Sequence, residues 1–378
     1  MIMIGDIHMR NSQSLGEERV TKLLAEFAVP SIIAMLVSSL YNIVDQFFIG
    51  RSVGELGNAA TNISFPFSIM CVAIALLFGI GGASQVNLSM GKGKKEEAVY
   101  YMGNSAIMLF LCGIVLSFIT LIFLEPLLKF FGSPVNVLGY AKTYTRITAI
   151  GFPFLILATG GGHLIRADGS PGFTMLCNLT GAVINTILDA LFVSVMDFKM
   201  AGAAVATVIG QVVSAIMVII YLRHCKTMAL EKRHLLPKRK YVSKIAALGA
   251  APCSNQLAMM VVQIVMNKSL KYYGSRSVYG ESIPIACVGI ITKINQVFMA
   301  FIIGISQGLQ PIVSFNYGAG KYKRVREAYL KAISVGTGLA VIAFLAFQIL
   351  PRQITGIFGN GTKEYFDFAI SYFRIFLF

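Results

Sequence analysis

Apolar and polar stretches alternate along the chain with a regular spacing. Apolar runs of roughly 20 residues or more recur, and each is long enough to cross a hydrocarbon core about 30 Å thick. Lipid offers no partner to an unpaired backbone amide, so each run is expected to be a helix. The pattern predicts membrane helices at 27–49, 58–89, 103–124, 140–165, 171–196, 200–222, 244–268, 284–315 and 328–350, with a tenth starting near 367.

Composition supports an all-α membrane protein. Of 378 residues, 56% are hydrophobic and 13% are charged, whereas a soluble domain carries about 25% charged residues. Residues 1–25 are mixed and charged, with no short apolar core before a small-residue cleavage site, so we expect no cleavable signal peptide. We therefore predict a multi-pass protein of the inner cell membrane, with residues 1–25 forming a cytoplasmic N-terminal segment.

The chain is basic, with 32 Lys and Arg against 17 Asp and Glu. The basic residues gather in alternate loops, as cytoplasmic loops of membrane proteins require, so we do not expect a nucleic-acid partner. Residues 223–243 are the longest basic segment and predict a cytoplasmic linker between two halves. The Lys and Arg residues of this linker are Arg223, Lys226, Lys232, Arg233, Lys238, Arg239 and Lys240.

The two halves repeat each other at an offset of about 227 residues. Six helices per unit is an even number, so both units enter the membrane from one face and are parallel repeats. We predict a six-helix lobe at 26–222 and an incomplete second lobe at 244–378, from a parent chain of twelve helices that is about 75 residues longer. The matching positions are Gly81, Gly91, Gly93 and Lys94 with Gly308, Gly318, Gly320 and Lys321, followed by Phe131 and Gly132 with Phe358 and Gly359.

Two carboxylates, Asp45 and Asp189, fall inside predicted membrane helices. Charges in the membrane are costly and mark functional sites by default. Asp45 lies about five residues before the outer end of the first helix, and Asp189 about seven before that of the fifth, so both lie roughly 7–11 Å below the outer surface. The alternative for each is a helix-end carboxylate that reaches the headgroups.

Polar side chains surround these two carboxylates at helical spacing. Asn178, Asn185 and Asp189 fall at i, i+7 and i+11, which places them on one stripe of the fifth helix. The amides could instead serve only as hydrogen bonds between helices, and a Thr in a membrane helix commonly bonds its own backbone. The predicted polar cluster of the first lobe comprises Asp45, Asp189, Asn185, Thr207, Tyr41, Asn178 and Gln211.

Lys293 is a charge where the second lobe should be apolar. It lies about ten residues into the eighth helix, roughly 14 Å deep along its axis. An unpaired ammonium there costs at least about 2.5 kcal/mol. We expect Lys293 to face the cavity between the lobes, either contacting the first-lobe carboxylates in one state or hydrated there without a role in coupling.

Other motifs carry less chemistry. The glycine clusters at 79–82 and 160–162 predict close helix packing, and no GKS or GKT follows them, so we do not expect ATP as a direct energy source. His163 is expected to be a packed residue rather than a proton relay. The six cysteines show no metal spacing and no HExxH pair is present, so we expect neither an enzyme nor a cofactor.

Several motifs together resemble the multidrug and toxic compound extrusion (MATE) family. They are the pattern from Pro30 to Gly50, the stretches GIGGASQVNLSMGKGK and LIRADGSPG, and the pair Asn185 and Asp189. The stretch GISQGLQPIVSFNYGAGK in the second half, which repeats the first of these stretches, belongs to the same set. The resemblance implies a V-shaped bundle of two six-helix lobes, and export of large, often cationic amphipathic molecules. Some members carry a glutamate in the seventh helix for a sodium site, whereas the stretch after Pro252 here has no carboxylate.

Two transport functions therefore compete. The first is a monomeric antiporter that exports small molecules across the bilayer in exchange for H⁺ or Na⁺, with Asp45, Asn185 and Asp189 as the ligands where Na⁺ is used. The second is a lipid-linked oligosaccharide flippase of the same superfamily. Its cavity should be rich in Arg and Lys to bind pyrophosphate, whereas this first lobe offers carboxylates.

Overall fold

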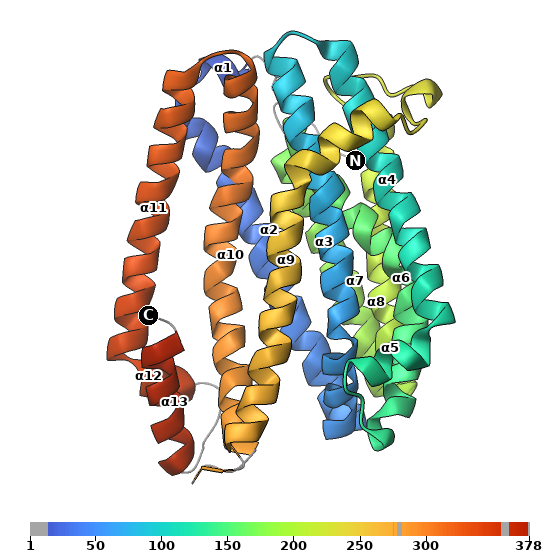
Figure 1. Cartoon of the computed structure of the whole chain (residues 1–378), viewed down its shortest axis with the longest axis vertical. Helices are drawn as coiled ribbons and strands as arrows, with labels where there is room; N and C mark the ends of the chain where they lie inside the picture. The colour runs from blue at the N-terminus through green and yellow to red at the C-terminus, as the bar shows by residue number, and fades with distance from the viewer. Residues whose placement is uncertain (1–13, 275, 278–281, 357–362, 377–378) are drawn as a thin grey trace.

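The computed structural model describes residues 14–274, 276–277, 282–356 and 363–376, and the regular structure in these ranges is helical throughout (Figure 1). The α-helices are α1 (Ser14–Glu17), α2 (Val20–Val53), α3 (Glu55–Gly91), α4 (Lys95–Ile122), α5 (Leu124–Phe130), α6 (Val135–Ala167), α7 (Pro171–Asp189), α8 (Lys199–Arg223), α9 (Arg239–Gly274), α10 (Ser282–Gly318), α11 (Tyr322–Ile349), α12 (Pro351–Gly356) and α13 (Lys363–Phe376). A π-helix, Ala190–Val195, continues α7, and a 3₁₀ turn, Lys232–His234, precedes α9.

Nine helices in the described ranges are long and apolar enough to cross a membrane: α2, α3, α4, α6, α7 with its π-helix, α8, α9, α10 and α11. They correspond one to one with the first nine predicted helices. The tenth, α13, begins at Lys363 rather than near 367, and 14 of its residues are described, fewer than the roughly 20 that a span needs.

The helices extend further than predicted. The first membrane helix begins at Val20 rather than at 27, and the seventh ends at Gly274 rather than at 268. Hydropathy detects only the part of a helix inside the hydrocarbon core, whereas backbone hydrogen bonds continue into the headgroup region. The short helices α5 and α12 are not predicted, because a search for long apolar runs passes over them.

The internal repeat is confirmed by the helix boundaries. A shift of 227 residues carries Glu55–Gly91 onto Ser282–Gly318 and Lys95–Ile122 onto Tyr322–Ile349. The same shift carries the start of α5, Leu124, onto the start of α12, Pro351. The two halves are therefore parallel copies of one arrangement, and they form a V-shaped bundle of two lobes.

Two helices connect the lobes, since α2 packs against α10 and α9 packs against α3. Close approaches mark both contacts: a Cβ at Gly308 would lie 2.5 Å from the backbone nitrogen of Ala28, and one at Gly249 would overlap the backbone of Leu77. Because α2 and α9 each contact both halves, the lobe boundaries at 222 and 244 stay a prediction.

We call one end of the bundle the basic end. It holds α1, the turn between α3 and α4, the segment between α8 and α9, and the turn between α10 and α11, all at the top of Figure 1. The opposite end holds α5 and the connection from α2 to α3. The acidic residues of interest lie in the half of the first lobe nearer this opposite end.

The glycine clusters pack helices, as predicted. A Cβ at Gly79 of α3 would lie 2.7 Å from the Cα atom of Gly160 of α6, so the two backbones touch. Such an approach is available only to residues without a side chain. Other members of the two clusters approach other helices in the same way, as Gly81 does the backbone of Ile245 on α9, so the clusters leave no room for a phosphate.

Candidate acidic site in the first lobe

The structure brings Asp45 and Asp189 together. Asp45 is on α2 and Asp189 is the last residue of α7, and their carboxyl groups lie within hydrogen-bonding reach of each other. Asp189 is 0% exposed and Asp45 is 8% exposed. The Oδ1 atom of each is buried and has no hydrogen-bond partner among the described residues. Two such carboxyl groups repel each other unless they share a proton or bind a cation.

Asn185 ties this pair to α8. In the amide orientation that satisfies its neighbours, Nδ2 donates to Asp189 Oδ2 at 3.2 Å, and Oδ1 accepts from the backbone N–H of Thr207 at 3.2 Å. Asn185 is buried at 3% exposure, one turn before Asp189 on α7. It therefore fixes the orientation of the Asp189 carboxyl group and joins Thr207 to the site.

Two tyrosines complete the surroundings of the pair. Tyr41 lies one turn before Asp45 on α2 and is close enough to feel the charge of both carboxylates. Tyr144 on α6 is similarly close to Asp45 and Asp189, and lies within hydrogen-bonding reach of Thr207. Sequence reasoning missed Tyr144. No polar periodicity on its own helix indicated a site.

Tyr144→Phe tests whether this tyrosine belongs to the site. We expect the variant to fold, because the ring is kept, and to export a cationic dye several-fold more slowly, since loss of one hydrogen bond between neutral groups costs about 0.5–1.5 kcal/mol. Initial export rates from vesicles containing equal amounts of protein provide the measurement. A rate equal to that of the unsubstituted protein would remove Tyr144 from the site.

Three predicted residues are not placed at the carboxyl pair. Gln211 on α8 turns towards α6, where a Cβ at Gly151 would lie 2.7 Å from its Oε1 atom. Asn178 lies partly exposed on α7, nearly two turns before Asn185, and the described contacts do not connect it to the carboxylates. Lys293 belongs to α10, but its side chain lies outside the described part of the structure, so its predicted position stays untested.

A third acidic residue of the first lobe, Asp168, has a structural role. It follows α6 in the LIRADGSPG motif and is 1% exposed. Its carboxylate accepts hydrogen bonds from the Tyr221 hydroxyl at 2.9 Å, the backbone N–H of Lys226 at 2.8 Å, and the hydroxyl of Thr227. These bonds fix the start of the basic segment after α8.

His163 is buried in α6, as expected of a packed residue. Its Nδ1 atom lies 3.0 Å from Nη2 of Arg166, and the two side chains are 2% and 3% exposed. His163 and Arg166 lie near the end of α6 at the basic end, whereas Tyr144 of the acidic site lies near the start of the same helix. We therefore leave His163 out of the candidate site.

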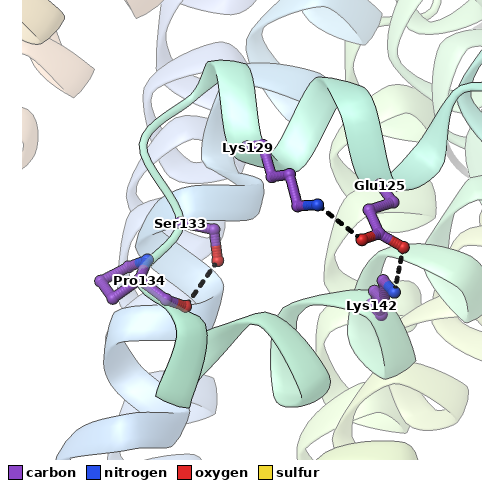
Figure 2. Close-up of polar contacts among 5 residues, drawn as sticks. All are labelled: Glu125, Lys129, Ser133, Pro134 and Lys142. Carbon is purple, nitrogen blue, oxygen red and sulfur yellow. Dashed lines mark hydrogen bonds and ion pairs between the residues drawn. The ribbon is translucent and has the colours of Figure 1, made fainter.

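Glu125 at the opposite end provides a control carboxylate (Figure 2). It lies on α5, between Lys129 at 2.8 Å and Lys142 on α6. The hydrogen bonds and charges of these two lysines lower the pKa of Glu125 from its ordinary 4.5 to about 2. In the turn that follows α5, Ser133 donates to the carbonyl oxygen of Pro134 at 3.4 Å.

The pKa of Glu125 predicts its behaviour with pH. Because the folded-state pKa is lowered, the stabilising effect of these ion pairs is fully present above the ordinary carboxyl pKa and is lost only as the pH falls through about 2. Glu125→Gln should therefore leave the pH dependence of export unchanged between pH 5 and 8. Export rates across that range test this, and a displaced pH profile would show that Glu125 takes part in coupling.

Comparisons with known proteins agree with this architecture. The model of the MatE family matches residues 30–191 and 251–378. The multidrug export protein MepA of Staphylococcus saprophyticus is 25% identical over 342 residues, covering 90% of this chain and 74% of that protein. MepA of Staphylococcus haemolyticus is 26% identical over 326 residues, covering 86% and 71%.

Solved structures show the same fold. A multidrug resistance MATE family transporter of the MOP superfamily, in an outward-facing conformation, superposes with a TM-score of 0.89 at 22% identity, covering 98% of this chain and 81% of that one. A MOP superfamily transporter from Pyrococcus furiosus, described as having a binding pocket of reverse polarity, gives a TM-score of 0.88 at 22% identity, covering 98% and 82%. The chain is a multi-pass membrane protein and belongs to the MatE family.

Proposed function

We propose that the protein is a secondary-active efflux transporter. It exports amphipathic, often cationic compounds in exchange for H⁺ or Na⁺, with Asp45 and Asp189 as the coupling site. The observation that carries this proposal is the contact between two buried carboxyl groups inside a membrane lobe. The multidrug export relatives support the substrate class.

The acidic pair can couple the movement of the substrate to that of H⁺ or Na⁺, because the substrate and the ion compete for the same negative charge. With a proton or a cation bound, the pair is partly neutralised and attracts a cationic substrate less strongly. Without it, the pair carries more negative charge and binds such a substrate more strongly. Exchange follows if each ligand binds a different conformation preferentially, because a ligand shifts a conformational equilibrium only by its differential affinity.

The contact between the two carboxyl groups favours H⁺ over Na⁺ as the coupling ion. Two carboxyl groups in contact can share one proton, which removes the repulsion between two negative charges. Export from proteoliposomes under a pH gradient alone, and under a Na⁺ gradient alone, separates the two. We expect the pH gradient to drive export, and export driven only by Na⁺ would contradict this assignment.

The flippase alternative remains the main competitor within the superfamily. The Pyrococcus furiosus transporter shows that pocket polarity can differ on this fold. A pyrophosphate-linked lipid needs Arg or Lys side chains in the cavity, whereas the described site here is acidic. Translocation of a lipid-linked oligosaccharide in vesicles, without export of a cationic dye, would favour the flippase.

We infer the topology from the distribution of basic residues. The basic end carries Lys92, Lys94 and Lys95 in one turn, Lys321, Lys323 and Arg324 in another, and the basic segment before α9, so we propose that it faces the cytoplasm together with the N-terminus. The acidic site then lies nearer the external surface. We further propose that the transporter acts as a monomer and needs no cofactor.

A further inference from the structure

At the basic end, the N-terminal segment is bound to the second lobe. Residues 14–18, which we call the first strap, lie against the turn between α10 and α11 (Figure 1). Asn316 Nδ2 donates to the carbonyl oxygen of Leu15 at 2.9 Å, and Arg324 Nη2 donates to the carbonyl oxygens of Leu15 at 3.2 Å and Glu18 at 2.5 Å. The first strap leads directly into α2, which carries Asp45.

The contact is tightly packed. Lys321 Nζ donates to the carbonyl oxygen of Gly16 at 2.9 Å, and a Cβ at Gly16 would lie 3.0 Å from both that nitrogen and the ring of Phe315. Arg324 Nε donates to Oδ1 of the fully buried Asn316 at 3.0 Å, which fixes the guanidinium group. Arg324 therefore joins the first strap to α10 and α11 through several charge-assisted hydrogen bonds.

The segment before α9 makes the reciprocal contact. Residues 226–238, the second strap, lead into the second lobe but are bound to the first. Asn104 of α4, which is 0% exposed, donates from Nδ2 to the carbonyl oxygen of His234 at 3.0 Å. The backbone N–H of Lys238 donates to Asn104 Oδ1 at 2.7 Å. The segment that precedes each lobe is thus bound to the other lobe.

Between the two straps, the lobes meet along α3 and α10. A Cβ at Gly91 would overlap the carbonyl oxygen of Phe315, and one at Gly318 would overlap that of Leu88. These contacts are reciprocal, because the shift of 227 residues relates Gly91 to Gly318 and Leu88 to Phe315. The backbones touch, so this structure is closed at the basic end.

We propose that the two straps hold the basic end closed, and that the Arg324 contacts must break before it opens. The inference rests on the proposed function in one respect, since export requires this end to open to the cytoplasm in each cycle. The glycine contacts let the lobes meet but add little directional attraction. The straps supply that attraction through buried amide and charged hydrogen bonds, which are stronger than neutral surface contacts.

The test measures the separation of the lobes directly. Spin labels are attached at Lys92→Cys and Lys323→Cys, both exposed at the basic end, in protein whose six native cysteines are replaced. Distance distributions by pulsed electron resonance are compared for the unsubstituted sequence, Arg324→Gln, and a variant lacking residues 1–18. Arg326→Gln is the matched control, because Arg326 is an exposed arginine on the same helix.

We expect Arg324→Gln and the shortened variant to add a longer distance, with the ratio of open to closed populations raised about tenfold or more, and Arg326→Gln to leave the distribution unchanged. A distribution that the removal of residues 1–18 leaves unaltered would overturn the proposal, even if Arg324→Gln fails to fold. The measurement needs no transport. A protein that opens as expected but exports nothing would therefore count against the proposed function alone.

Discussion

Asp45→Asn is expected to reduce gradient-driven export of a cationic dye to the level of passive leak. The amide keeps the shape of the carboxyl group, but it can neither exchange a proton nor offer its charge to a cation. Loss of a proton-transferring group typically costs about 10²–10⁴-fold in rate, so we expect a fall of at least about a hundredfold. The measurement is the initial rate of dye export from proteoliposomes under an imposed gradient.

Glu125→Gln is the matched control for this variant. It also removes one carboxylate from the first lobe, but Glu125 lies on α5 between two lysines, away from Asp45 and Asp189. Export should continue at the unsubstituted rate. Asp45→Asn protein that inserts in equal amounts and exports as fast as the control would show that Asp45 has no part in coupling.

Asp189→Asn should have a comparably large effect, and the two effects should not add. The carboxyl groups of Asp45 and Asp189 lie in contact, so they bind a proton or cation as one unit. Once either is replaced, the unit is lost, and the second substitution has little left to remove. The double variant should therefore export no more slowly than the slower single variant.

A double-mutant cycle on export rates provides the measurement. Residues in contact typically show interaction energies of about 0.5–3 kcal/mol, whereas distant sites add. Partial variants such as Asp45→Glu and Asp189→Glu keep rates measurable if the amide variants fall below detection. Two partial defects that add fully would indicate separate sites, against the shared site described here.

Much of the fold could be predicted from sequence because lipid leaves few choices. In the part of the chain that the structure describes, nine of the ten predicted apolar runs correspond to long helices, and the repeat at 227 residues recurs in their boundaries. The ends of the helices could not be predicted in the same way. They lie in the headgroup region, where hydrogen bonding to water or to the chain is equally available and hydropathy changes gradually.

The acidic site was predictable where polar residues share a helix face. Depth along the helices brought Asp45 and Asp189 to one level, and the stripe on the fifth helix added Asn185. Tyr144 could not be found this way, because its part depends on how α6 packs against α8, which brings its side chain to Thr207 and the two carboxylates. Gln211 lies one turn from Thr207 on α8 with its Oε1 atom beside Gly151 of α6, and its part in the site stays a prediction.

The straps lay beyond sequence reasoning for a related reason. Residues 14–18 bind through their backbone carbonyl groups, and backbone groups leave no trace in residue type. Arg324 and Lys321 were explained by the positive-inside rule, which accounts for their side of the membrane but not for their partners. Only the arrangement of α10 and α11 shows which carbonyl groups they meet.

The central proposal is that a cationic substrate is exchanged for a counter-ion at the acidic pair. Measuring the movement of that ion across the membrane tests it most directly. Proteoliposomes containing a trapped pH indicator receive a cationic substrate on one side, with no pH or Na⁺ gradient imposed. We predict that substrate movement drives protons the other way in the unsubstituted protein, and that Asp45→Asn shows no proton movement. Substrate movement without any opposing movement of protons or Na⁺ would contradict the proposal.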